Sequence, residues 1–203
     1  MHGFSLELTR EFGAIELASA LLYAFSAMLW LWTRTGQMWR YAWQVPTILL
    51  LMMGREIDLD KQITSVGILK SELYLTATAP PFERIFGLLV LAFLIVTIVR
   101  LAIVNGPELL AGLKARALWA SSLAIAACLG VLSKSIDGLS RKLDAFGISI
   151  DSQTSTAAAV TEEIMELGIP IMALISIISS IRSGGSASIV GAGSVGASQQ
   201  RRA

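Results

Sequence analysis

The sequence predicts an all-α polytopic membrane protein with about five transmembrane helices and one amphipathic helix on the membrane surface. Hydrophobic residues make up 54% of its 203 residues and charged residues 15%, and the mean hydropathy is +0.67. Soluble domains contain about 25% charged residues, and the apolar residues here are concentrated in long blocks of the kind that span a bilayer. We expect one helical membrane domain, residues 1–182, followed by a disordered Gly/Ser-rich tail, residues 183–203.

Composition and motifs exclude several other classes of protein. A net charge of +1 provides no basic surface for nucleic acid. The only histidine is His2, so a histidine-based zinc site or a Ser–His–Asp triad is not available. Cys128 lies within an apolar block and is interpreted as a packing residue. Residues 191–196 imitate a GxGxxG motif, but they follow no strand and fall in the tail, so they predict no nucleotide site.

The first predicted span, residues 14–33, carries a single charge, Glu16, in its first turn. A basic segment rich in tryptophan, residues 34–43, follows it. Tryptophan and arginine are typical of the lipid head-group layer. This segment therefore predicts a membrane interface.

The second predicted span is residues 43–62. Pro46 suits its first turn, where the N–H that proline lacks is not needed. The apolar run 47–53 is shorter than the roughly 20 residues that a span requires, so the helix must continue through the charged stretch 54–61. Three acidic residues then lie in its last third: Glu56, Asp58 and Asp60.

Residues 63–80 are expected to form a loop with a short helix at about 67–75. The third span is residues 81–104, and Asn105-Gly106-Pro107 predicts its end.

The fourth span, residues 118–133, is rich in small residues, which allow helices to approach closely in lipid. These residues predict contact with a membrane-protein partner or a second copy of the chain: Ala120, Ala124, Ala126 and Gly130.

Apolar residues recur at helical spacing over residues 136–146, with charges on the other faces, which predicts the surface helix. The fifth span is residues 157–181, and glutamates lie in its first part. Gly168 and Pro170 interrupt it. Because Pro170 cannot donate a hydrogen bond to the carbonyl of Glu166, a kink is expected there.

The distribution of charge predicts an orientation in the membrane. Five spans place two short basic loops and the tail on one side, and nearly all acidic residues on the other. Short basic loops favour the cytoplasm, although lysine and arginine totals are nearly balanced between the two sides. We therefore expect a multi-pass protein of the cell inner (plasma) membrane with a cytoplasmic C-terminus, and four spans as the alternative to five.

This topology gathers acidic residues from several helices near the outer side. Glu56 and Asp60 share one helix face, and Glu162 and Glu166 share another, because each pair is four residues apart. Like charges at this spacing repel, so a cation, a shared proton or a basic side chain is expected beside them. These four carboxylates are the predicted metal ligands or proton carriers. Further charges expected in the same layer are Arg55, Asp58, Arg84, Glu163 and Glu16, with Arg55 and Asp58 paired.

Three functions are compatible with this acidic layer. The first is a polar site that binds or passes a small cation or proton; a carboxylate set would suit Mg²⁺, Ca²⁺ or Mn²⁺. The second is a membrane-embedded enzyme that acts on a lipid or lipid-linked substrate with the same carboxylates. The third is a non-catalytic subunit of a membrane complex, whose ion pairs lock helices together or dock a partner. Charges at helix ends also commonly mark the head-group layer without any further role.

Overall fold

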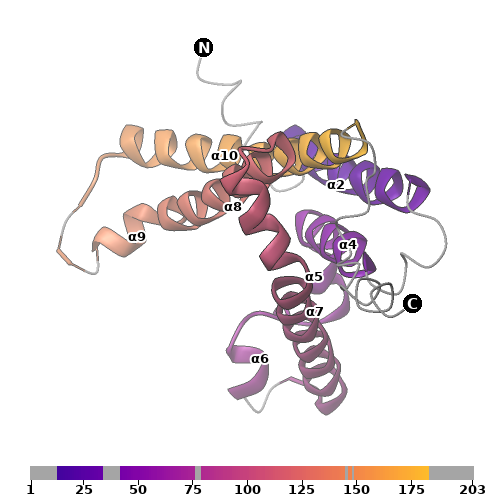
Figure 1. Cartoon of the computed structure of the whole chain (residues 1–203). Coiled ribbons are helices and arrows are strands. Elements are labelled where there is room, and N and C mark those ends of the chain that lie inside the picture. Colours follow the sequence, from indigo (N-terminus) through magenta and orange to yellow (C-terminus); the bar gives the residue numbers. More distant parts are fainter. Residues whose placement is uncertain (1–12, 34–41, 76–78, 145, 148, 183–203) are drawn as a thin grey trace, which may run out of the picture.

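The computed structural model describes residues 13–33, 42–75, 79–144, 146–147 and 149–182, and their regular structure is helical (Figure 1). This confirms the all-α class. The predicted tail, and most of the predicted basic interface, lie outside the described residues. The described helices are α2 (Ala14–Thr33), α4 (Gln44–Glu56), α5 (Leu59–Ile63), α6 (Glu72–Leu75), α7 (Pro81–Lys114), α8 (Leu118–Ile136), α9 (Leu139–Asp144) and α10 (Ser152–Arg182).

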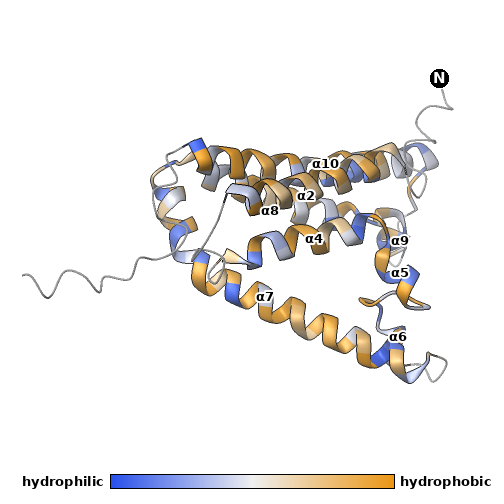
Figure 2. Cartoon of the chain, turned by 90° about the vertical axis from the view of Figure 1, so that its right-hand side faces the viewer, coloured by the Kyte–Doolittle hydropathy of each residue, from blue (hydrophilic) through white to orange (hydrophobic). Residues whose placement is uncertain are grey.

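Within the described residues, four helices are long and apolar enough to cross a membrane: α2, α7, α8 and α10. Hydrophobic residues extend along most of their length (Figure 2). The architecture is therefore that of an integral membrane protein, and the described residues contain four candidate spans where about five were expected.

The second predicted span breaks after Glu56. At 1.5 Å per residue, α4 is about 20 Å long, which is less than the ~30 Å hydrocarbon core of a bilayer. Asp58 then adopts a left-handed conformation with φ of 51°, and aspartate is one of the few residues that tolerates it. Its carboxylate contacts the ammonium of Lys61 at 2.8 Å. The expected continuous helix over 43–62 is thus replaced by α4, a turn and α5.

The third predicted span does not stop at Asn105-Gly106-Pro107. Helix α7 continues through this segment to Lys114, and a proline within a membrane helix is tolerated when neighbouring groups satisfy the backbone. The chain leaves the helix where Arg116 takes a positive φ of 54° and the N–H of Ala117 donates to the carbonyl of Gly112 at 2.9 Å.

Helix α10 is also longer than predicted, and it continues through Gly168 and Pro170. Asp151 precedes it and accepts hydrogen bonds from the backbone N–H groups of Gln153 and Thr154 and from the Thr154 hydroxyl. The Thr154 side chain, followed by these backbone groups, holds the pKa of Asp151 below its usual value. Asp151 is therefore charged at neutral pH and caps the helix N-terminus.

The helices form a bundle from which α7 departs at an angle. Helix α10 packs along α8 and α2, and α4 packs on α2 (Figures 1 and 2). The buried core between them consists of Tyr23, Ala27, Trp30, Ala42, Leu49 and Ile177. Much of α7 is exposed and apolar, as expected for a surface facing lipid. This packing brings the C-terminal ends of α4 and α8 close to the first half of α10.

Candidate functional site

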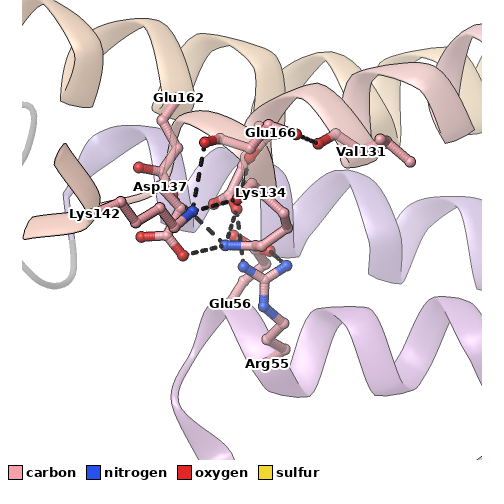
Figure 3. Close-up of polar contacts among 10 residues, drawn as sticks. Arg55, Glu56, Val131, Lys134, Asp137, Lys142, Glu162 and Glu166 are labelled. Atoms are coloured by element: carbon pink, nitrogen blue, oxygen red, sulfur yellow. Dashed lines mark hydrogen bonds and ion pairs between the residues drawn. The ribbon is translucent and has the colours of Figure 1, made fainter. Parts of the chain in front are cut away.

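A charged cluster lies where α4, α8 and α10 meet. Helix α4 contributes Arg55 and Glu56 at its C-terminal end, α8 contributes Lys134, and α10 contributes Glu162 and Glu166 (Figure 3). The side chains point toward one another from the three helices. Three helices that are distant in sequence are thus joined by their charges.

Glu166 is the centre of the cluster. Its Oε1 atom lies 2.9 Å from Nη2 of Arg55 and 3.0 Å from Nζ of Lys134, and it accepts a hydrogen bond of 3.1 Å from the Ser133 hydroxyl. Only 15% of its side chain is exposed. Charge-assisted bonds of this length are stronger than neutral ones, so Glu166 links α10 to both α4 and α8.

Lys134 extends the cluster along α8. Its ammonium lies 3.3 Å from Asp137 and 3.6 Å from Glu162, in addition to its contact with Glu166. Lys142 lies beside it and donates to the carbonyl of Lys134 at 3.0 Å. Lys134 therefore neutralises part of the negative charge from α10 and from Asp137, the residue that follows α8.

Glu56 is the most buried carboxylate of the cluster, with 6% of its side chain exposed. Its contact with Nη1 of Arg55 is 3.8 Å, which exceeds hydrogen-bond distance. Glu16 and Glu163 lie within electrostatic range of it. Carboxylates therefore outnumber cations around Glu56, and the guanidinium beside it is bonded more closely to Glu166.

The pairing predicted between Arg55 and Asp58 is wrong. Arg55 reaches Glu166 instead, and Asp58 pairs with Lys61. The reason is the turn after α4: because Asp58 leaves the helix, helical spacing no longer applies to its side chain. The cluster thus includes Arg55 without Asp58.

Asp60 takes part in the loop between α5 and α6. One of its carboxylate oxygens accepts the backbone N–H of Ile68 at 3.3 Å, close to Gly67, which has a positive φ of 95°. Arg84 lies near the start of α7, an end that Figures 1 and 2 place beside α6 and away from α10. The predicted layer is therefore divided between the cluster and this loop region.

Three cluster residues were not among the predicted site residues: Ser133, Lys134 and Asp137. A signal for them was present in the sequence, because the fourth predicted span ends at residue 133 on the side where the fifth begins. A lysine directly after that end should meet the glutamates of the fifth span.

The small-residue face of α8 packs within the chain itself. Ala120 and Ala126 are buried, and Gly130 faces the Ile169 side chain of α10. Ala124 is half-buried. The close approach expected from these residues is thus made to neighbouring helices, and a contact with a partner or second copy stays a prediction.

Among the described residues, no group of three or more His, Cys, Asp or Glu side chains is arranged to hold a metal ion. The charged groups bonded to the Glu166 carboxylate are instead the guanidinium of Arg55 and the ammonium of Lys134. Binding of Mg²⁺, Ca²⁺ or Mn²⁺ by Glu56, Asp60, Glu162 and Glu166 stays a prediction.

An apolar cavity of about 330 Å³ lies elsewhere, between α4, α7, α8 and α10. Its wall includes Trp30, Leu49, Trp119 and Ile177, and none of the cluster residues lines it.

No family model, curated protein or solved structure matches the chain. The chemistry open to the cluster therefore follows from its own groups, which are carboxylates that accept and release protons and cations that hold them in place.

Proposed function

We propose that this membrane protein binds and transfers protons at the charged cluster, with Glu56 as the proton carrier. The observation that carries the proposal is the environment of Glu56, a buried carboxylate whose neighbouring guanidinium is bonded to Glu166. Ionisable groups among membrane helices are costly and usually functional. A carboxylate surrounded by further carboxylates can relieve repulsion by taking up a proton.

A proton suits this site better than a metal ion. A hard divalent cation requires several oxygen ligands around one point, and the described residues offer no such group. A proton needs one carboxylate and a neighbour that receives it. Arg55 then serves as the counter-charge that stabilises the carboxylate of Glu56 after the proton leaves.

The proposed location is the cell inner (plasma) membrane with the C-terminus in the cytoplasm. Arg182 ends α10, and the tail beyond it closes with Arg201 and Arg202. Positive charges next to a span favour the cytoplasmic side. Protons would then move between the cytoplasm and the compartment outside this membrane.

Glu56→Gln is expected to abolish proton flux, because the amide keeps the shape of the side chain but cannot bind and release a proton near neutral pH. Flux is measured in liposomes that enclose a pH-sensitive dye, after a potassium diffusion potential is applied with valinomycin. The expected rate equals that of protein-free liposomes. Glu72→Gln, in the exposed first turn of α6, is the matched control and should retain the wild-type rate.

The proposal would be contradicted if Glu56→Gln conducted protons as fast as the wild type. It would also fail if wild-type liposomes were no more permeable than empty ones. Melting with and without Mg²⁺ tests the divalent-cation alternative: stabilisation that disappears in both Glu56→Gln and Glu162→Gln would favour a metal site over a proton site.

A second candidate is a non-catalytic subunit whose ion pairs fix the helix arrangement. The observation that favours it is the direct bonding of Glu166 to Arg55 and Lys134, which joins three helices. In this case the Glu56→Gln variant has no transport phenotype, and the cluster affects stability alone.

A further inference from the structure

A buried stripe of hydroxyl groups extends along α2, formed by Ser19, Tyr23 and Ser26. Their exposed fractions are 1%, 2% and 0%. The spacing of four and three residues places them on one face of the helix. Among the described residues, none of the three hydroxyls has a hydrogen-bond partner. This face of α2 thus presents three polar atoms to the interior of an apolar bundle.

Buried hydroxyl groups without hydrogen-bond partners lower the stability of a membrane protein. A buried hydroxyl without a partner loses its hydration and receives nothing in exchange, and hydrocarbon offers no partner. The usual solution is a bond to the carbonyl one turn earlier in the same helix. The buried Ser122 and Thr97 make this bond, to Leu118 at 2.8 Å and to Phe93 at 2.7 Å. Ser19 and Ser26 do not make it, and the hydroxyl of Tyr23 is too far from its own helix backbone to make it, so the three hydroxyls are available to another ligand.

The stripe adjoins the charged cluster. Tyr23 lies within electrostatic range of Glu56, Arg55 and Glu166. At the opposite end of α4 from Glu56, Gln44 is fully buried, and both its amide atoms are without a partner among the described residues. Twelve residues separate Gln44 from Glu56, which is about 18 Å at 1.5 Å per residue. Polar groups without partners therefore occur from the cluster toward the far end of α4.

We propose that the hydroxyl stripe binds a line of buried water molecules that connects Glu56 with the interior of the bundle toward Gln44. Buried water typically makes about three hydrogen bonds to polar groups that otherwise have no partner. The transfer role of the line rests on the proton function proposed above, whereas the binding of water does not. In transfer, Glu56 gives its proton to the first water, each water passes one proton on as it receives one, and the last water releases a proton to solvent beyond Gln44, at the N-terminal end of α4. Glu56 then takes up a new proton from solvent on its own side of the membrane.

The sign of a stability change tests for water. If the hydroxyls bind water, Tyr23→Phe and Ser26→Ala leave that water with too few partners, and the Tm should fall below that of the wild type. If the hydroxyls are dry and unpartnered, removing them relieves a cost, and the Tm should stay the same or rise, which would overturn the proposal. Ser122→Ala and Thr97→Val provide the matched controls, because they remove hydroxyls that are bonded within their own helix.

A second measurement needs no substitution. Hydroxyl-radical footprinting of the wild-type protein in detergent, read by mass spectrometry, labels side chains next to bound water. We expect Tyr23 to be labelled despite its burial and Leu73, which is 0% exposed, to remain unlabelled. Absence of label on Tyr23 under conditions that label exposed residues such as Phe82 would count against the water line.

Proton flux separates this inference from the function on which it rests. Tyr23→Phe should slow flux in liposomes about tenfold, which corresponds to ~1.4 kcal/mol in the barrier. If the wild type conducts and Tyr23→Phe conducts equally with a raised Tm, the water line is wrong and Glu56 remains the carrier. If the wild type does not conduct but Tyr23 is labelled and its substitution lowers the Tm, the proton function is wrong and the bound water is supported.

Discussion

Glu166→Gln is expected to lower the free energy of unfolding by about 2 kcal/mol. The substitution keeps the shape of the side chain but removes the charge that bonds Arg55 at 2.9 Å and Lys134 at 3.0 Å. Hydrogen bonds to charged groups contribute roughly 1.5–3 kcal/mol. The loss is smaller than for a fully buried network, because 39% of the Arg55 side chain and 49% of the Lys134 side chain are exposed and can rehydrate.

The measurement is denaturation of the purified protein in detergent micelles, followed by circular dichroism. Glu162→Gln is the matched control on the same helix, one turn earlier. Its contact with Lys134 is 3.6 Å, so its cost should be below about 1 kcal/mol. Equal losses for the two variants would show that Glu166 is not the centre of the network. Exchanging the partners, with Arg55→Glu and Glu166→Arg together, should recover part of the stability lost by either change alone.

The helices themselves could be predicted from the sequence because hydropathy is a local property. Apolar blocks predicted α2, α8 and the apolar part of α10 at nearly their observed positions. The break after Glu56 could not be predicted in the same way. It depends on Asp58 adopting a left-handed backbone and on its contact with Lys61. In the sequence, Asp58 looks like another charged residue in a helix.

For α7 the error was the reverse: the sequence predicted a helix end where the helix continues. Asn105-Gly106-Pro107 is a strong local signal for a helix end, yet the helix continues through it to Lys114. The rule that proline stops helices is derived from chains in which water offers the backbone other partners. In lipid, leaving the helix would expose backbone groups without partners, and the helix is therefore the less costly state.

Site residues that lie together on one helix were predicted from the sequence. Contacts between residues on different helices were missed. Glu162 and Glu166 were placed together by spacing within α10, and both lie at the cluster. Asp60 was placed with Glu56 by the same rule, but the turn at Asp58 moves it to the loop that bonds Ile68. Lys134 reaches Glu166 across 32 positions of the chain, and such a contact follows from packing between helices rather than from any local pattern.

The close contact between α7 and α8 requires a glycine at position 112. A Cβ atom at Gly112 would lie 2.6 Å from Cζ2 of Trp119 and 2.8 Å from the Cβ of Ala120. Real Cβ atoms do not approach carbon so closely, so either the Trp119 ring or the start of α8 would have to move. Because Trp119 also lines the apolar cavity and its carbonyl accepts a hydrogen bond from Ser176 at 2.8 Å, a shift there would disturb the packing of α10 as well.

Gly112→Ala is therefore expected to lower the free energy of unfolding by up to about 2 kcal/mol, the net of an overpacking cost of roughly 1–3 kcal/mol and a gain of about 1 kcal/mol in helix propensity. Gly130→Ala in α8 is the matched control, because it makes the same change within a helix where an added Cβ meets only the Ile169 side chain, at the ordinary contact distance of 3.6 Å. It should raise the free energy of unfolding by up to ~1 kcal/mol. Denaturation of both variants in the same detergent gives the comparison, and a stabilising effect at both glycines would show that α7 and α8 do not approach each other as closely as Gly112 requires.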